Sequence, residues 1–421
     1  MIVTEIASLY VKNGYDIFTS HNHNKPLHGG FSGMKQVLAG FRVLDFGHYI
    51  PGPYTAMLLA EQGAEVIKIE PPAGDPMRSE KGFVVLNRSK KGMVLDLKKE
   101  EGKKIAQALI KKADVVIENF KPGKADQLGI GYETVKVLNP STVHCSISGY
   151  GQFGPYRNRP GWDPIVTSTA TVYVEQGGTG IASPVFLVLP LASYYSAFMA
   201  AYSITIALIA REKTGKGQQV DISLLNSIMA ASCGGLVNFE ARERVPRSYQ
   251  QGGSPVYRLY QGSDGKWFFL ALGNLAFLAK FAIAIGHEEW LTDERFEGAP
   301  FMILPPVNEE LIEMFEKIFA EKTRDEWLEF LQAEDIPCGP ALSVEAFMDD
   351  PQVIANDMVT EIEEPGLGPV RQMGVPVRLS QAPGAIKGRS PQKGEHTEEI
   401  LSNSLNYSAE EISRLKQEKV I

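Results

Sequence analysis

The first half of the chain alternates short apolar runs with helical patterns, and this alternation limits the folds it can adopt. Runs of strand type lie at residues 41–46, 64–70, 114–117 and 142–148. Helical patterns lie between them, at 52–60 after a Pro/Gly turn and at 102–112. Strands separated by helices usually pair in parallel, because the chain must cross over between them. The sequence therefore predicts an α/β fold with a doubly wound, Rossmann-like sheet.

The second half of the chain changes in character. A helical pattern covers 194–211, and a Gly-rich turn leads to a strand at 219–222 and a helix at 224–233. Further on, two short strands flank Ser263-Asp264-Gly265, a hairpin-turn signal. Helical segments at 276–285 and 308–331, extended pieces at 359–362 and 375–379, and a charged helix at 408–419 complete the pattern.

These patterns predict how the chain is divided. The large domain is α/β and the small domain is α+β, and the final segment returns to complete the large domain. The expected parts are an N-terminal arm at 1–36, the large domain at 37–235, a linker at 236–255, the small domain at 256–345 and the return segment at 346–421.

Composition excludes several classes of protein. With 44% hydrophobic and 22% charged residues, the 421-residue chain has the composition of a soluble globular protein. A formal net charge of −8 argues against nucleic acid as a partner. The longest apolar run, 197–210, is broken by polar residues before the about 18 residues that a membrane span needs. We therefore expect no nucleic-acid and no membrane partner.

Cysteine and histidine spacing gives no sign of a disulfide framework or a metal site. Three widely spaced cysteines fit neither pattern and are typical of a reducing cytoplasm, where we expect the protein to reside. His21, His23 and His28 lie in the polar arm without a cysteine or an adjacent acid to complete a metal site. A solvated arm is the favoured interpretation, and no metal is expected.

Nine segments, in order, resemble the class III CoA-transferases, the family that includes formyl-CoA:oxalate and carnitine-type CoA-transferases and alpha-methylacyl-CoA racemase. Each segment alone is weak, but their order is specific, and together they cover nearly everything from about residue 37 onward. They are 43–46 with Pro51-Gly52-Pro53, 63–70, 87–96, 113–123, Gly149-Tyr150-Gly151, Arg159-Pro160-Gly161-Trp162-Asp163, 214–218, 336–340 and 394–397.

The resemblance implies that coenzyme A and an acyl-CoA are substrates, together with a carboxylic acid, and that no cofactor is permanently bound. It also implies an interlocked dimer, in which two ring-like chains are threaded through each other. The residues that it places at the coenzyme A pocket are Tyr49, Ile50, Pro51, Leu95, Asn119 and Phe120, with Lys90, Lys91 and Lys98 near the phosphates and Arg159 in a loop by the active site.

The family's nucleophilic Asp is missing. Counting back from Thr214-Gly215-Lys216-Gly217-Gln218 places it at Ser193, and no Asp or Glu occurs from Gln176 to Arg211. A serine needs a nearby base and would give an ester that is too stable to pass its acyl group back to CoA. Asp163 is the other candidate, but its Gly-x-Asp motif accompanies the catalytic Asp in the family and more often orients a helix start.

Three hypotheses follow from Ser193. The chain is the non-catalytic subunit of a heteromeric transferase whose related partner carries the Asp, as in a succinyl-CoA:(R)-benzylsuccinate-type enzyme. Alternatively, it transfers CoA alone in a non-covalent ternary complex, or it binds CoA without catalysis. Trp162 stands where racemases of the family have a catalytic His, which argues against racemisation. Aromatic residues that would suit a bulky acyl group are Trp162, Tyr173, Phe186, Tyr194 and Tyr195.

Overall fold

The computed structural model describes residues 36–177, 184–232 and 251–421. These residues divide between two compact units. The large unit takes 36–172, 187–232 and 351–421, and the small unit takes 173–177, 184–186 and 251–350. The predicted N-terminal arm, its three histidines and most of the predicted linker lie outside the described residues, and the domain boundaries stay a prediction.

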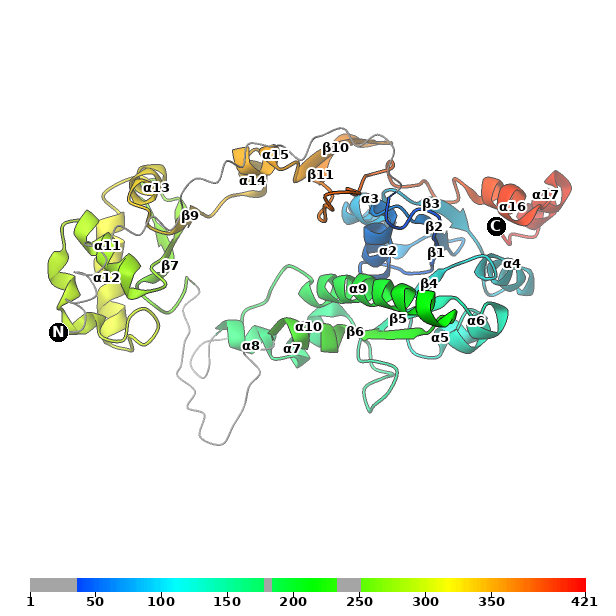
Figure 1. Cartoon of the computed structure of the whole chain (residues 1–421), viewed down its shortest axis with the longest axis horizontal. Coiled ribbons are helices and arrows are strands. Elements are labelled where there is room, and N and C mark those ends of the chain that lie inside the picture. Colours follow the sequence, from blue (N-terminus) through cyan, green and yellow to red (C-terminus); the bar gives the residue numbers. More distant parts are fainter. Residues whose placement is uncertain (1–35, 178–183, 233–250) are drawn as a thin grey trace. The chain divides into compact units, whose positions relative to one another are not determined.

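The large unit is built on a six-stranded sheet with the order β3-β2-β1-β4-β5-β6 (Figure 1). Every neighbouring pair is parallel, which confirms the parallel α/β sheet. The strands are β1 (Arg42–Asp45), β2 (Glu65–Glu70), β3 (Lys91–Val94), β4 (Val115–Glu118), β5 (Val143–Ser148) and β6 (Gln219–Ser223). The sequence pattern missed β3, because its four residues begin with Lys91-Gly92 and do not form an apolar run.

Helices cover both faces of this sheet. Val43 and Val66 point to the face packed by α2, α9 and α10, whereas Leu44 and Ile67 point to the face packed by α4, α16 and α17. Alternate strand residues face opposite sides of a sheet, so both sets are apolar here. The helices of the large unit are α2 (Pro51–Glu61), α3 (Gly82–Asn87), α4 (Glu100–Ile110), α5 (Lys124–Gln127), α6 (Tyr132–Leu138), α7 (Asp163–Thr169), α9 (Leu191–Thr214), α10 (Leu224–Ser232), α16 (Thr397–Leu405) and α17 (Ala409–Gln417). All but the first residue of α8 (Val172–Gly177) belongs to the small unit.

The long helix α9 has two apolar faces. One is rich in small residues and is buried in the core of the large unit, where Ala192, Ala200 and Ala207 lie. On the other, Tyr195, Phe198, Tyr202, Ile206 and Ile209 are 43–63% exposed, and we call these five residues the α9 stripe. By length and composition alone α9 is apolar enough to cross a membrane, but its buried face is that of a core helix.

The return segment at 351–421 closes the edge of the sheet. Backbone N–H groups of β3 donate to side chains of this segment, from Gly92 to His396 Nδ1 at 3.1 Å and from Val94 to Thr397 Oγ1 at 3.1 Å. The segment begins with α15 (Pro351–Ala355) and an antiparallel ribbon of β10 (Val359–Glu364) and β11 (Gly368–Met373). The extended piece expected at 375–379 is not part of a strand. The partner of β10 precedes it, because a turn at 365–367 brings the chain back earlier.

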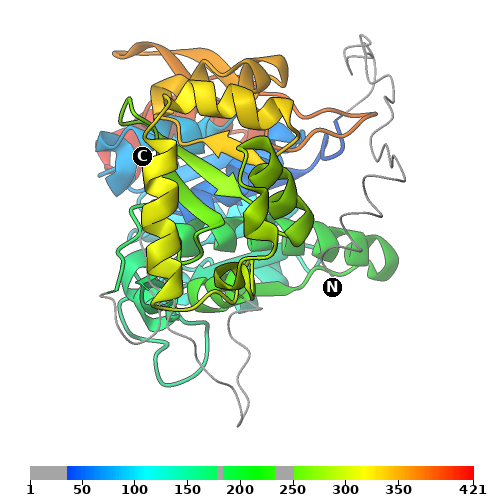
Figure 2. The same cartoon turned by 90° about the vertical axis from the view of Figure 1, so that its left-hand side faces the viewer.

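The small unit has a three-stranded sheet, β7-β8-β9, in which neighbouring strands are antiparallel. Figure 2 shows its helices (yellow and green) beside these strands. The expected helix at 308–331 is two helices, because Thr323 caps a new one by bonding reciprocally with Glu326. Its elements are β7 (Tyr257–Gln261), β8 (Trp267–Ala271), β9 (Cys338–Pro340), α11 (Leu275–Ala284), α12 (Val307–Phe319), α13 (Arg324–Ala333) and α14 (Val344–Met348), with 3-10 turns η3 (Glu288–Leu291) and η4 (Glu294–Phe296).

Candidate functional site

A cavity of about 530 Å³ lies in the large unit where β1, β4, β5 and β6 end. The strand order reverses between β1 and β4, and in open α/β sheets ligands bind in the crevice at this reversal. Residues from the loops after all four strands line the cavity, together with the start of α9. The sequence-predicted residues that the structure brings together here are Tyr49, Ile50, Pro51, Asn119, Phe120, Arg159, Asp163 and Ser193.

The loop after β1 holds Tyr49 in a strained backbone conformation. Its φ of 60° is a left-handed value that non-glycine residues rarely adopt. The Asn119 side chain fixes the loop by accepting from the His48 N–H at 2.7 Å and donating to the His48 carbonyl at 2.8 Å. The Tyr49 N–H itself donates to Asp75 Oδ1 at 3.3 Å. Asn119 therefore positions the neighbouring loop as well as lining the cavity.

Two buried ion pairs support this loop from below. Lys68 Nζ lies 2.8 Å from Asp75 and 2.9 Å from the Gly47 carbonyl, and Lys90 Nζ lies 2.8 Å from Asp45. All four charged side chains are fully buried. Since the N–H donors of each ammonium reach both a carboxylate and a loop carbonyl, the pairs fix the backbone from Gly47 to Pro53.

Lys90 does not fit its predicted role at the CoA phosphates. Its three N–H donors bond to Asp45, the Pro53 carbonyl and Asn87 Oδ1, so none is left for a phosphate. Burial lowers the pKa of Lys90 to about 8, although the Asp45 carboxylate opposes this effect. Lys90 is a support of the loop.

Three other predicted residues, Lys91 and Lys98 near the phosphates and Leu95 at the pocket, also lie away from the cavity lining. Lys91 pairs with Glu399 at 2.9 Å and with Glu65 at 3.5 Å, Leu95 is buried in the core, and Lys98 is exposed. The cations that do line the cavity are Lys121, Arg157 and Arg159, all exposed. None of these three side chains forms an ion pair with another residue in the described ranges.

Ser193 and Asp163 meet at the start of α9. The Ser193 N–H donates to Asp163 Oδ2 at 2.6 Å, and the Thr167 hydroxyl donates to Asp163 Oδ1 at 3.1 Å. Asp163 therefore joins the first turn of α9 to α7, and each of its oxygens accepts one hydrogen bond. Among the residues that the structure describes, no histidine or carboxylate accepts a hydrogen bond from the Ser193 hydroxyl. Within the described part of the chain, the serine therefore has no base to activate it.

One aromatic pair lines the cavity. The rings of Tyr49 and Trp162 meet edge to face, with centroids 5.0 Å apart and an interplanar angle of 82°. The other aromatics expected around an acyl group have other neighbours. Tyr194 packs on Tyr54 at 5.7 Å, Tyr173 and Phe186 pack on each other at 5.6 Å in the small unit, and Tyr195 belongs to the α9 stripe.

Glu118 belongs to the family-like segment 113–123 but was not among the predicted site residues. It ends β4, is buried, and accepts the Phe120 N–H at 2.8 Å, which fixes the cavity wall. Burial raises the pKa of Glu118 to about 7, against hydrogen bonds from Ser146 and Phe120 that lower it. A carboxylate directly after the apolar run Val115-Val116-Ile117 was the available sequence signal.

Two glycines close the neck of the loop from Tyr150 to Pro160. A Cβ atom on Gly149 would lie 2.4 Å from the Cα of Gly161, so the two backbones touch. No larger residue fits at either position without moving the chain. The neck joins the end of β5 to Trp162 at the start of α7.

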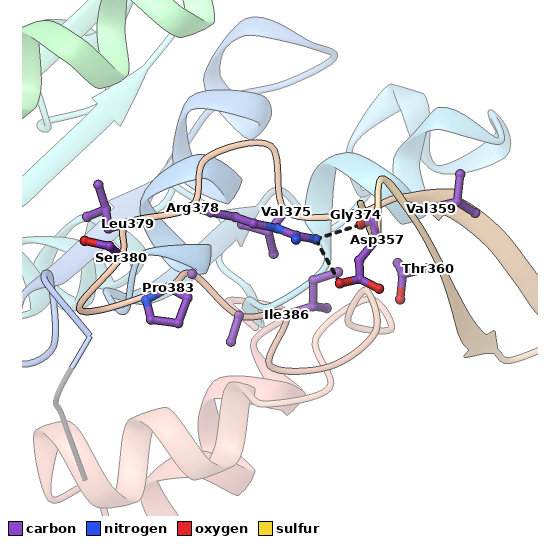
Figure 3. A pocket seen from close by; sticks show the side chains of 12 residues that line it. Asp357, Val359, Thr360, Gly374, Val375, Arg378, Leu379, Ser380, Pro383 and Ile386 are labelled. Carbon is purple, nitrogen blue, oxygen red and sulfur yellow. Dashed lines mark hydrogen bonds and ion pairs between the residues drawn. The ribbon is translucent and has the colours of Figure 1, made fainter. Parts of the chain in front are cut away.

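A second cavity, of about 570 Å³, lies beside β10 and β11 (Figure 3). Its charged side chains are Asp357 and Arg378, which form an ion pair at 3.4 Å. No predicted site residue lines it. Within 36–177, 184–232 and 251–421, no cluster of three or more His, Cys, Asp or Glu residues could hold a metal ion.

Comparisons with known proteins show the family of the chain. Residues 38–397 match the family described as CoA-transferase family III. The chain belongs to this family. Among its relatives are the alpha and beta subunits of succinyl-CoA–L-malate CoA-transferase from Chloroflexus aurantiacus, both 32% identical. The alpha-subunit alignment covers 93% of this chain and 94% of the relative, and the beta-subunit alignment covers 91% and 98%.

A solved relative supports the fold. The crystal structure of a CAIB/BAIF family protein from Brucella suis is 29% identical and matches with a TM-score of 0.74. The match covers 88% of this chain and all of that protein. The family placement made from the ordered sequence segments is therefore confirmed, and with it CoA-transferase chemistry on acyl-CoA and carboxylate substrates as the family's activity.

Proposed function

We propose that this chain is a subunit of a class III CoA-transferase, and that a related partner chain supplies the nucleophilic carboxylate. CoA moves between an acyl-CoA, such as succinyl-CoA, and a carboxylic acid. The cavity at the carboxyl ends of β1, β4, β5 and β6 holds part of the CoA thioester. The exposed cations Lys121, Arg157 and Arg159 suit its phosphates, because charge-assisted hydrogen bonds to phosphate are strong.

The observation that carries this proposal is that Ser193, at the position of the family's nucleophilic Asp, has no neighbouring base among the described residues. Ser193 lies in the cavity lining without a base, and Asp163 has both oxygens engaged in holding α7 to α9. In the family's chemistry a carboxylate attacks the thioester and forms a mixed anhydride, which keeps the acyl group activated. A serine ester would lack the free energy to acylate CoA again.

The α9 stripe supports a partner chain. Five large apolar side chains, each at least 43% exposed, follow one face of the helix whose first turn contains Ser193. A contiguous exposed apolar face marks an interaction surface in soluble proteins. Relatives that are named alpha and beta subunits support pairing of two related chains, of the interlocked kind that the family resemblance implies.

The test is restoration of the carboxylate. We expect the purified wild-type chain alone to give no transfer from succinyl-CoA to carboxylates and no hydroxylamine-sensitive acyl adduct. Ser193→Asp is expected to acquire such an adduct, located by mass spectrometry on residue 193. Ser193→Asn, of nearly the same size but without a nucleophilic oxygen, is the matched control and should remain unlabelled.

Two outcomes would overturn the proposal. An acyl adduct on the wild-type chain would show that it carries its own nucleophile. Turnover by the wild-type chain alone, unchanged in Ser193→Ala, would instead favour a non-covalent ternary complex in which the acceptor carboxylate attacks the thioester directly.

A further inference from the structure

We propose that Glu118, Ser146 and His144 form a buried hydrogen-bonded relay beneath the cavity wall, and that an anionic CoA ligand binds in the cavity together with a proton held on Glu118. None of the three residues lines the cavity. The inference rests on the proposed function, because only an anion in this cavity can change which charge is favoured beneath it. It adds a positioning residue and a dependence on pH to the proposed site.

The relay lies one residue away from the cavity on two neighbouring strands. Glu118 ends β4, and the next two residues, Asn119 and Phe120, line the cavity. Ser146 lies on β5 directly opposite Glu118, and the residue after it, Ile147, lines the cavity too. Consecutive Cα atoms are about 3.8 Å apart, so a charge on Glu118 lies close to any ligand that contacts this wall.

The hydrogen bonds within the relay have a defined direction. His144 Nε2 lies 3.0 Å from the Ile130 carbonyl, which can only accept, so Nε2 carries the proton and Nδ1 is an acceptor. Burial lowers the pKa of His144 to about 4, and the ring is therefore neutral at neutral pH. The Ser146 hydroxyl lies 3.4 Å from Nδ1 and also bonds to the Glu118 carboxyl. The single proton of this hydroxyl thus has two competing acceptors.

Every group of the relay has a partner when Glu118 is protonated. The acid O–H then donates to Ser146 Oγ, and the Ser146 O–H donates to His144 Nδ1. The second Glu118 oxygen accepts the Phe120 N–H at 2.8 Å. When Glu118 is ionised, the Ser146 proton turns to the carboxylate and Nδ1 loses this donor. Because a buried acceptor without a partner costs free energy, the geometry favours the neutral acid.

The ionisable groups around Glu118 act in the same direction. Asp126 on α5 and Asp221 on β6 raise its pKa, as burial does, and the result is a value of about 7. The neighbouring Cys145 thiol stays neutral, because burial raises its pKa as well. Across the described ranges, Glu118 has no ion-pair partner. The proton on Glu118 is therefore held near neutral pH, where a further charge can shift it.

A bound CoA brings that further charge. Its phosphates are negative, and negative charge near Glu118 disfavours the carboxylate and favours the acid. Binding free energies are reciprocal, so a ligand that raises the pKa of Glu118 binds more tightly when Glu118 is already protonated. We therefore expect CoA to bind most tightly below about pH 7 and less tightly above it.

The test measures CoA binding to the full-length chain by calorimetry at about pH 6.5 and about pH 8.5. In the wild type, the dissociation constant should rise by about threefold to tenfold across this range. Glu118→Gln should lose most of this rise, because its amide accepts the Phe120 N–H and donates to Ser146 as the neutral acid does. Glu133→Gln, exposed on α6, is the matched control and should retain the wild-type dependence.

Proton uptake separates the relay from a merely structural role of Glu118. At about pH 7.5, calorimetry in two buffers of different ionisation enthalpy should show about half a proton more taken up per bound CoA by the wild type than by Glu118→Gln. A phosphate of CoA itself titrates near about pH 6, and the comparison of the two proteins removes its contribution.

His144→Phe tests the relay beyond Glu118 and keeps a ring beside Tyr132. Without Nδ1 the Ser146 proton has only the carboxylate as acceptor, which favours ionised Glu118. The pH midpoint of the fall in CoA affinity should therefore decrease by about half a unit or more. An unchanged midpoint would overturn the relay.

The remaining outcomes distinguish the inference from the proposed function. If CoA does not bind at any pH, the proposed function fails and the inference fails with it. If CoA binds with the same proton uptake and the same pH dependence in the wild type and in Glu118→Gln, the inference fails while the proposed function stands.

Discussion

Two cavities of nearly equal size in the large unit differ in how they are built. The cavity at the sheet edge, about 530 Å³, takes its lining from segments between Tyr49 and Leu224 that follow five different strands. The cavity beside β10 and β11, about 570 Å³, is lined only by residues from 357 to 386. The first offers cations without ion-pair partners, whereas Arg378 in the second is paired with Asp357. The two cavities therefore differ little in volume. They differ in that only the first has cations without ion-pair partners and lies beside a loop that buried ion pairs hold in place.

The largest expected effect concerns the buried ion pairs beneath the loop after β1. Lys68→Met leaves Asp75 buried without its partner and should lower the free energy of unfolding of the large unit by about 3–5 kcal/mol. Urea unfolding, followed by circular dichroism, measures the loss. Arg378→Met, at the partly exposed pair of the second cavity, should cost at most about 1 kcal/mol. Equal losses would show that the two cavities do not differ in rigidity.

The second prediction concerns pH and Glu118. Its pKa in the folded chain is about 7, above its ordinary value of 4.5. Between these values the unfolded chain releases the proton while the folded chain keeps it, so stability falls as pH rises from about 4.5 to about 7. The loss should approach about 3 kcal/mol and level off above pH 7.

Comparison of variants isolates this effect from other titrating groups. Glu118→Gln, which keeps the shape without the charge, should remove the fall in stability across that pH window. Glu133→Gln, whose side chain is 79% exposed on α6, should retain the wild-type profile. A profile for Glu118→Gln that parallels the wild type would contradict the prediction.

The smallest effect concerns the unpaired cations. Lys121→Ala and Arg157→Ala should each weaken CoA binding by about threefold to tenfold, with a smaller dependence on salt, because each removes one phosphate contact. Arg378→Ala is the matched control, since it removes a cation from the other cavity and should leave the dissociation constant unchanged. Calorimetry of CoA binding at two salt concentrations distinguishes these results. Equally weakened CoA binding in all three variants would show that the two cavities do not differ in their role.

The sequence predicted the sheet well because its strands are continuous apolar runs buried on both faces. It missed β3, whose pairing with β2 and with the return segment is a tertiary effect. It also predicted α12 and α13 as one helix, since the helix start after Thr323 depends on a capping pair within an otherwise continuous helical pattern.

For the site, motif position was a better guide than residue chemistry. Tyr49, Asn119 and Ser193 follow strand ends or begin a helix, and they reach the cavity. Lys90 has the right chemistry for phosphate, but it is buried and bonded to Asp45, which lies 45 residues away in sequence on β1. Spacing along a chain does not reveal such partners. The edge-to-face contact of Tyr49 with Trp162 was hidden for the same reason.

The touching glycines at 149 and 161 have a consequence for how this surface can vary. Because the loop between them is tied at its neck, residues 150–160 can change in length or composition without displacing Trp162 or Asp163. Arg157 and Arg159 belong to this tied loop. The charged residues of this loop can thus be replaced while Trp162, next to Asp163, keeps its position beside Tyr49 and the start of α9.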